Sequence, residues 1–299
     1  MERIRVLDFK TDKWEKYPQY LKESKASCKV YEQYLYITYN NYLYKYDLAN
    51  MCMATDKIKL DIGGRISFFA DDYIFLIDIQ NLYIIDKNDF LLKNVMTLKE
   101  AFNLGGKYPT SDLGSVFYYN HSKVYITVRN GWIYILDIVK KEIEKIQFNP
   151  HSCWNVFEIG DHFHFSTVKG ELIELNKSSL KITRKTKISK TNLAYMEVYD
   201  NKFYTIARDE TIRVIDIATH EIIQNSDEKA VETQASLAGI YKNQLFVADW
   251  NKIKVFDVET LQRLDIFPFP TDKYSAGVWL HDNKLFSTDE KGLFFSILD

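Results

Sequence analysis

Glycine, proline and cysteine are all scarce in this chain, whose 299 residues include 11 Gly, 5 Pro and 3 Cys. Tyrosine and phenylalanine are abundant instead, with 21 and 19 copies, and this balance favours many strands joined by tight polar turns. The cysteines, Cys28, Cys52 and Cys153, are odd in number, widely spaced and never paired as CxxC. We therefore expect reduced thiols in a cytoplasmic protein.

Long apolar runs and a strong net charge are also missing. No segment approaches the roughly 18 consecutive apolar residues of a membrane helix, and the N-terminal MERIRVLDF is charged from the start, unlike a secretory signal. The formal net charge is −2, which argues against a broad nucleic-acid or anionic-membrane footprint. With 46% hydrophobic and 27% charged residues, the chain can form a packed core. We expect no nucleic-acid or membrane partner.

What the sequence does contain is a module repeated seven times. In each copy a polar turn is followed by a short apolar run, such as "SKVYITV" from Ser122 or "NKFYTIA" from Asn201. The spacing between copies is about 40 residues, except for one interval of 51 between Tyr73 and Val124. The first apolar residues of the seven runs are Tyr34, Tyr73, Val124, Phe163, Phe203, Leu245 and Leu285.

Each copy has the pattern of four short antiparallel strands. A single such sheet cannot bury both of its faces, but seven sheets packed face to face in a circle can, with only short outer edges left exposed. The sequence therefore predicts an all-β protein, a seven-bladed β-propeller of four-stranded antiparallel blades that forms one domain over residues 1–299. The third run of most copies ends in Asp, whose short side chain suits an Asx turn into the fourth strand. A catalytic ring of these Asp residues is the weaker interpretation, because it would lie on the turn side of every blade.

The two ends of the chain are expected to complete one blade together. The last repeat has only three strands, and the N-terminal "RVLDF" resembles a fourth strand, so we expect Ile4–Phe9 to close the ring; residues 14–17 are the alternative. The 51-residue interval marks an insertion at about residues 97–114, between the second and third blades. A long loop there is a candidate recognition element or a tolerated insertion.

The repeat resembles the WD40-like and quinoprotein-like (YVTN) superfamily of seven-bladed propellers, through strands that end "IYILD", "RVIDI" or "KVFDV" before a polar turn. The resemblance spans essentially the whole chain, but it is architectural. The Gly-His and Trp-Asp dipeptides of WD40 repeats are missing, as are the tryptophan-docking motifs of quinoprotein dehydrogenases, which argues against a bound quinone. The resemblance implies a binding platform, since a minority of such propellers are enzymes.

No strong catalytic motif is present, and we expect no cofactor, catalytic residue or metal site. His162 and His164 form an HxH pair on one strand face and could share a metal, but no third ligand is evident nearby. His220 is interpreted as a polar turn residue. Cys153 and His151 could form a nucleophile pair, although a small buried apolar role suits Cys153 better.

Comparison of the repeats also predicts a binding face. Five residues after each second-strand start, the copies differ widely in residue type, and the neighbouring loops that lead into the first strands add more aromatic and basic side chains. These residue types dominate binding hot spots, and Arg holds carboxylates in a fork. The predicted binding residues at the channel mouth are Arg65, Arg129, Trp154, Tyr195, Arg208 and Trp250.

Three function classes remain open at this level. The leading one is a non-enzymatic protein–protein interaction platform that binds a protein or peptide partner on the channel-mouth face, as a scaffold or as an inhibitor or immunity-type partner of another protein. The alternative is an enzyme, a lyase or hydrolase with a polar or metal site at the channel mouth. A small-molecule sensor is the third and weakest class.

Overall fold

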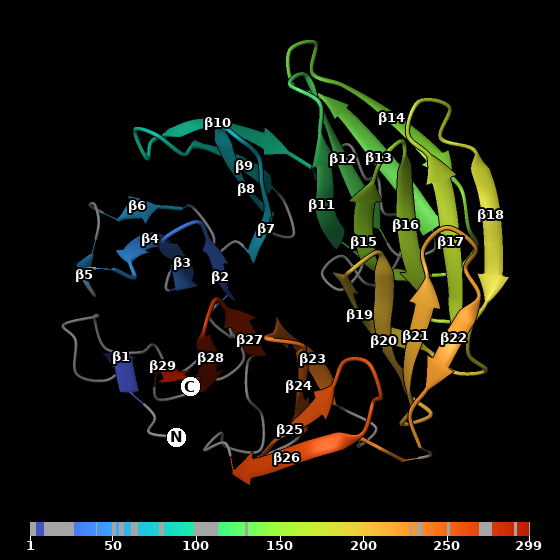
Figure 1. The fold of residues 1–299 in the computed structure, drawn as a ribbon. Coiled ribbons are helices and arrows are strands. Elements are labelled where there is room, and N and C mark those ends of the chain that lie inside the picture. The colour runs from blue at the N-terminus through green and yellow to red at the C-terminus, as the bar shows by residue number, and fades with distance from the viewer. Residues whose placement is uncertain are drawn as a thin grey trace, which may run out of the picture. The chain divides into compact units, whose positions relative to one another are not determined.

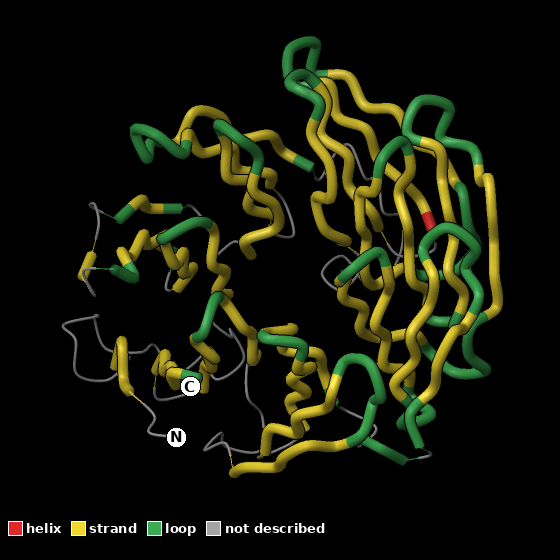
Figure 2. Tube along the Cα trace, viewed as in Figure 1, coloured by secondary structure: helices red, strands yellow, loops and turns green. Residues whose placement is uncertain are grey.

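The strands that the computed structural model describes form seven antiparallel sheets (Figure 1). The structure describes residues 4–8, 27–39, 41–49, 52–53, 57–60, 65–77, 81–98, 113–128, 131–227, 229–231, 235–249, 252–268, 277–289 and 292–298. In this part of the chain, strands and short loops account for almost everything (Figure 2). The predicted fold class is confirmed: the protein is an all-β, seven-bladed β-propeller, and we number its sheets as blades 1–7 in chain order.

The first three blades lie in the compact unit of residues 26–153. Blade 1 contains β2 (Ser27–Tyr31), β3 (Tyr34–Tyr39), β4 (Tyr42–Asp47) and a fourth strand in two pieces, β5 (Cys52–Met53) and β6 (Ile58–Lys59). Blade 2 contains β7 (Arg65–Phe69), β8 (Tyr73–Ile77), β9 (Asn81–Asp86) and β10 (Leu92–Thr97). Blade 3 contains β11 (Leu113–Tyr119), β12 (Lys123–Val128), β13 (Trp132–Asp137) and β14 (Glu142–Gln147).

The other four blades lie in a second compact unit, residues 1–25 with 154–299. Blade 4 contains β15 (Cys153–Ile159), β16 (His162–Thr167), β17 (Glu171–Asn176) and β18 (Ile182–Lys187). Blade 5 contains β19 (Leu193–Tyr199), β20 (Lys202–Ala207), β21 (Ile212–Asp216) and β22 (Ile222–Asn225). Blade 6 contains β23 (Ser236–Tyr241), β24 (Gln244–Asp249), β25 (Lys252–Asp257) and β26 (Arg263–Pro268). Blade 7 contains β27 (Gly277–His281), β28 (Lys284–Asp289), β29 (Gly292–Ile297) and β1 (Ile4–Asp8).

The N-terminal strand completes the last blade, as the sequence predicts. β1 pairs antiparallel with β29, with Ile4 opposite Phe295 and Asp8 opposite Gly292. Residues 14–17, the alternative closing segment, lie outside the described residues, as does the centre of the predicted insertion at 97–114. Blade 7 is therefore built from both ends of the chain, which removes an unpaired edge from each.

The hydrophobic core lies between successive blades within each unit. The second and third strands are buried along their length, as in β24 and β25, whereas fourth strands such as β14 and β26 are largely exposed. Separate apolar clusters fill the spaces between blades 1 and 2, 2 and 3, 4 and 5, 5 and 6, and 6 and 7. This pattern follows from the composition, because only a strand packed on both faces tolerates a continuous apolar run.

The turns between third and fourth strands are Asx turns. Asp137 Oδ1 accepts hydrogen bonds from the backbone N–H groups of Val139 and Lys140 at 3.0 and 2.9 Å, and Asp257 Oδ1 accepts one from Thr260 N at 2.7 Å. Comparable bonds are made by Asp47, Asp86, Asn176 and Asp216. Backbone bonding of this kind lowers the pKa of Asp137 and Asp257. The repeated Asp is a structural device.

Among the described residues no helix is long and apolar enough to cross a membrane.

Candidate functional site

Three of the predicted binding residues come together at one end of blades 4 and 5. Trp154, the second residue of β15, is 54% exposed; Tyr195, near the start of β19, is 40% exposed. A hydrogen bond from Asn155 Nδ2 to Ala194 O, 3.0 Å long, joins the residues that follow Trp154 and precede Tyr195. The exposed Arg208 is tied to the same end, because its backbone N–H donates to Asn192 O at 3.0 Å.

The structure does not describe the side chains of the other three predicted binding residues. Arg129 and Trp250 lie outside the described residues, and Arg65 is described only as the first backbone position of β7. The structure therefore assembles part of the predicted face, on the unit that contains blades 4–7.

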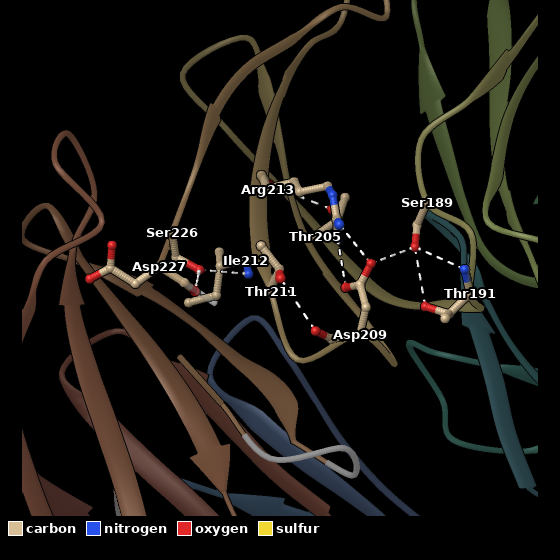
Figure 3. A network of polar contacts seen from close by, with 9 residues as sticks. All are labelled: Ser189, Thr191, Thr205, Asp209, Thr211, Ile212, Arg213, Ser226 and Asp227. Carbon is tan, nitrogen blue, oxygen red and sulfur yellow. Dashed lines mark hydrogen bonds and ion pairs between the residues drawn. The ribbon is translucent and has the colours of Figure 1, made fainter. Parts of the chain in front are cut away.

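A polar network holds this end of blade 5 in place (Figure 3). Arg213 grips Asp209 in a fork, with Nη1–Oδ1 and Nη2–Oδ2 distances of 2.9 and 2.6 Å. Ser189, in the loop that leads into β19, donates to Asp209 Oδ2 at 2.9 Å and accepts from Thr191 N at 3.0 Å. Burial by itself would raise the pKa of Asp209, but the hydrogen bonds from Arg213 and Ser189 outweigh it and lower that pKa. The network locks two loops that flank Tyr195 and Arg208.

The corresponding turn of blade 4 is held by backbone contacts. Gly170 has φ +73, and a Cβ there would lie 2.1 Å from Thr191 O and 2.3 Å from Ser189 O. Its carbonyl accepts hydrogen bonds from Ile188 N and Ser189 N at 2.9 and 3.0 Å. Glycine is needed here for two reasons: other residues are strained at this positive φ, and a Cβ would clash with the two carbonyl oxygens.

Two lysines extend the face beyond the sequence prediction. Lys169, in the turn before β17, and Lys190, in the loop before β19, are both exposed at this end of blades 4 and 5. The nearby Asp209 is already paired with Arg213. We call the surface formed by Trp154, Lys169, Lys190, Tyr195 and Arg208 the aromatic–basic face.

A second polar cluster lies buried between blades 4 and 5. His164 of β16, Glu174 of β17 and His220 of the turn before β22 are 3%, 9% and 1% exposed. His164 Nδ1 lies 3.2 Å from His220 Nε2, and His220 Nε2 lies 3.7 Å from Glu174 Oε2. One donor atom from each residue lies within 4.8 Å of the others. We call these three residues the His–Glu–His cluster.

Burial sets the protonation of the cluster. Loss of hydration lowers the pKa of His164 and of His220 to about 4, and the neighbouring His220 and Arg184, respectively, add to the effect. Burial alone would raise the pKa of Glu174, but the Thr183 hydroxyl, which donates to Oε1 at 2.5 Å, and the Arg184 charge lower it. At neutral pH the cluster therefore holds two neutral imidazoles and one carboxylate.

The sequence pointed to His162 and His164 as a pair with no third ligand evident, whereas the structure groups His164 with Glu174 and His220. Glu174 and His220 both reach His164, and His220 is a turn residue, as predicted, but with a buried side chain. Glu174 could have been found as the cross-strand partner of His164. His220 contacts a residue 56 positions away, so only alignment of the third-to-fourth turns would have singled it out.

Cys153 is partly exposed, so the predicted buried role is wrong. Its sulfur lies 3.9 Å from the backbone carbonyl oxygen of His151.

Comparison with solved structures agrees with the propeller class and shows the fold alone. The β-propeller domain of Cps50 (Swd1) from Myceliophteria thermophila superposes with a TM-score of 0.71 at 12% identity, covering 91% of this chain and 96% of that one. The computationally designed Ika8 protein superposes with a TM-score of 0.67 at 11% identity, covering 92% and 84%. No protein-family model matches the sequence, and no curated protein matches it.

Proposed function

We propose that the protein is a non-enzymatic interaction platform that binds an acidic segment of a protein partner on the aromatic–basic face. The observation that carries this proposal is the conjunction of two exposed aromatic rings, Trp154 and Tyr195, with the cations of Lys169, Lys190 and Arg208 at one end of two adjacent blades. Trp, Tyr and Arg are enriched in binding hot spots, and Arg binds carboxylates in a fork.

Rigidity of the face supports the same function. The Arg213–Asp209–Ser189 network and the Gly170 carbonyl hold both loops before any partner arrives. A preformed surface loses little conformational entropy on binding, so its contacts contribute more fully to affinity. Propellers of the WD40-like kind, which this chain resembles, serve mostly as protein-binding platforms. We propose the cytoplasm as the site of action, because the cysteines are few and widely spaced.

The test is affinity capture from the native host with mass spectrometry, comparing the natural chain with a Trp154→Ala/Tyr195→Ala/Arg208→Ala variant. We expect one stoichiometric partner that the variant loses, with binding by the natural chain weakening as salt rises, since the ion pairs are exposed. The matched control is Ile223→Ala/Leu264→Ala, which removes exposed apolar side chains from the fourth strands of blades 5 and 6. A partner that the triple variant retains unchanged would place the interface elsewhere, and the absence of any partner would contradict the platform.

A further inference from the structure

The repeats supply an internal standard for the His–Glu–His cluster. The fourth residue after the repeated Asp or Asn has a positive φ in five blades: Phe90 at 52°, Lys141 at 59°, Leu180 at 52°, His220 at 61° and Leu261 at 56°. At two of these positions the side chain is an apolar plug between blades. Phe90 is 4% exposed and joins the cluster between blades 1 and 2, and Leu261 is 4% exposed and joins the cluster between blades 5 and 6. His220 occupies the same position between blades 4 and 5.

The residues that this side chain packs against also occupy equivalent positions in the two junctions. Between blades 5 and 6, Leu261 joins Tyr204 and Val214, a directly opposed pair on β20 and β21. The equivalent opposed pair on β16 and β17 is His164 and Glu174. The third residue of the second strand is aromatic in the six other blades: Tyr36, Phe75, Tyr125, Tyr204, Phe246 and Phe286.

The junction between blades 4 and 5 therefore has two imidazoles and a carboxylate at three positions where the neighbouring junction has Tyr204, Val214 and Leu261. Folding does not require this exchange, because Tyr204, Val214 and Leu261 fill the neighbouring junction with neither a carboxylate nor an imidazole. Burying a carboxylate and two imidazoles is unfavourable unless their charge and hydrogen-bonding capacity are satisfied. A ligand that supplies positive charge at this point would account for the trio.

The geometry suits a small divalent cation. Donor atoms bound to a tetrahedral zinc ion at about 2.0–2.2 Å lie roughly 3.3 Å apart. The 3.2 Å between His164 Nδ1 and His220 Nε2 and the 3.7 Å between His220 Nε2 and Glu174 Oε2 are close to that separation. All three donor atoms lie within 4.8 Å of one another, so a bound ion would draw the Glu174 carboxylate toward His164.

Outer contacts orient the donors as metal sites require. Thr186 Oγ1 lies 3.5 Å from His220 Nδ1, at the ring nitrogen opposite the one that faces His164. The Thr183 hydroxyl fixes one carboxylate oxygen of Glu174 and leaves the other near His220. Such outer partners set the tautomer of a ligating histidine and the orientation of a ligating carboxylate.

We propose that His164 Nδ1, His220 Nε2 and the Glu174 carboxylate bind a borderline divalent cation of the Zn²⁺ type, which links blade 4 to blade 5. The three protein ligands are almost fully buried, and a water molecule would complete the tetrahedron around the ion. The competing explanation is a hydrogen bond between the two histidines, in which one ring nitrogen donates and the other accepts, with no ion bound.

The full chain, stripped with a chelator, is titrated with ZnCl₂ by calorimetry and with CoCl₂ by visible absorption. We expect one tight equivalent of Zn²⁺ and the strong visible bands of tetrahedral Co²⁺. Loss of an outer partner alone typically weakens metal binding about 10–100-fold, so we expect His220→Leu to weaken it by more than about 100-fold. The control, His121→Asn, changes an exposed turn histidine with φ 66, a conformation that Asn tolerates, and should leave binding unchanged.

A near-isosteric variant keeps the test decisive if His220→Leu fails to fold. Glu174→Gln preserves the volume and the Thr183 contact but removes the anionic ligand, so it should lose the Co²⁺ bands while remaining folded by circular dichroism. Absence of these bands in the natural chain, or their persistence in both variants, would overturn the metal site and favour the histidine–histidine hydrogen bond.

Discussion

Two neighbouring junctions of this propeller solve the same packing problem with different chemistry. Between blades 5 and 6, Tyr204, Val214 and Leu261 pack as an apolar trio; between blades 4 and 5, the same three positions hold His164, Glu174 and His220. The backbone is alike, since Leu261 N and His220 N both donate to the carbonyl of the preceding Asp at 2.9 Å. The repeated backbone therefore places a third-to-fourth turn residue against the second and third strands of the preceding blade, while the side chains at these positions can differ at a single junction.

The largest expected difference between the two junctions is the effect of acid on the free energy of unfolding of the metal-free protein. The pKa of His164 and of His220 is about 4 in the folded state, below the ordinary 6.5 of the unfolded chain. Above pH 6.5 both states are neutral. Between pH 6.5 and 4 the unfolded chain binds protons that the folded protein does not, so the free energy of unfolding falls as the pH falls, and it levels off below pH 4.

At about 1.4 kcal/mol per pKa unit, and with the two rings titrating as a coupled pair, we expect a loss of roughly 3–6 kcal/mol over this window. The titratable groups facing the rings are Glu174, His162, Arg184 and Asp216. Urea unfolding at a series of pH values measures the effect. A His164→Tyr/His220→Leu variant should lose most of this pH dependence; an equal slope in both proteins would contradict the assignment.

Truncation of Leu261 should lower the free energy of unfolding by nearly as much as acid does, and by the same amount with or without metal. Leu261→Ala leaves a cavity beside Tyr204 and Val214, and such changes destabilise proteins by about 2–5 kcal/mol. Urea unfolding should give the same loss with zinc and with chelator. Ile223→Ala, at a 52% exposed position of β22, is the matched control and should change stability by less than about 0.5 kcal/mol. If Leu261→Ala lowers the free energy of unfolding no more than Ile223→Ala does, Leu261 does not stabilise the packing of the two blades.

Zinc should stabilise one junction and leave the other unaffected. At a free concentration 100 times the dissociation constant, a ligand that binds only the folded state adds about 2.7 kcal/mol. Thermal unfolding of the natural chain and of Leu261→Ala should therefore shift upward equally when ZnCl₂ is added. His220→Leu should show no shift, and a shift of full size in that variant would show that zinc acts elsewhere.

The smallest expected effect is that of His162→Gln. His162 Nε2 lies 3.8 Å from Glu174 Oε1, but its side chain is 34% exposed. We expect its replacement to lower zinc affinity by less than about tenfold, since it lies outside the trio. Calorimetry checks this, and a loss of more than about 100-fold would make His162 a ligand of the ion.

Local patterns predicted most of the fold. The third strands of blades 1–6 end at the repeated Asp or Asn, as expected, and second strands begin either at the predicted residue, as at Tyr73, or one residue earlier, as at Lys123. The N-terminal strand was also predicted, because a three-stranded last repeat leaves an edge that only a similar strand can cover. These features depend on alternation, turn chemistry and repetition, which neighbouring residues encode.

Part of the aromatic–basic face was predictable for the same reason. Arg208 N bonds to Asn192 O, so the turn after β20 and the loop before β19 share one end of blade 5, as the strand pattern implies. Lys169 and Lys190 were missed, because the approach of the Gly170 turn to the loop at Ser189 and Thr191 depends on tertiary packing.

The sequence by itself determined the number of blades, the strand limits, the Asx turns and the pairing of the two chain ends, because each is a short-range or periodic property of the chain. Only the tertiary structure decided that His220 meets the His164–Glu174 pair. His164 and His220 are separated by 56 residues and come from different blades, and no local rule relates them. Their contact arises because each blade must bury its face against the next, which brings the third-to-fourth turn of one blade onto the second strand of its neighbour.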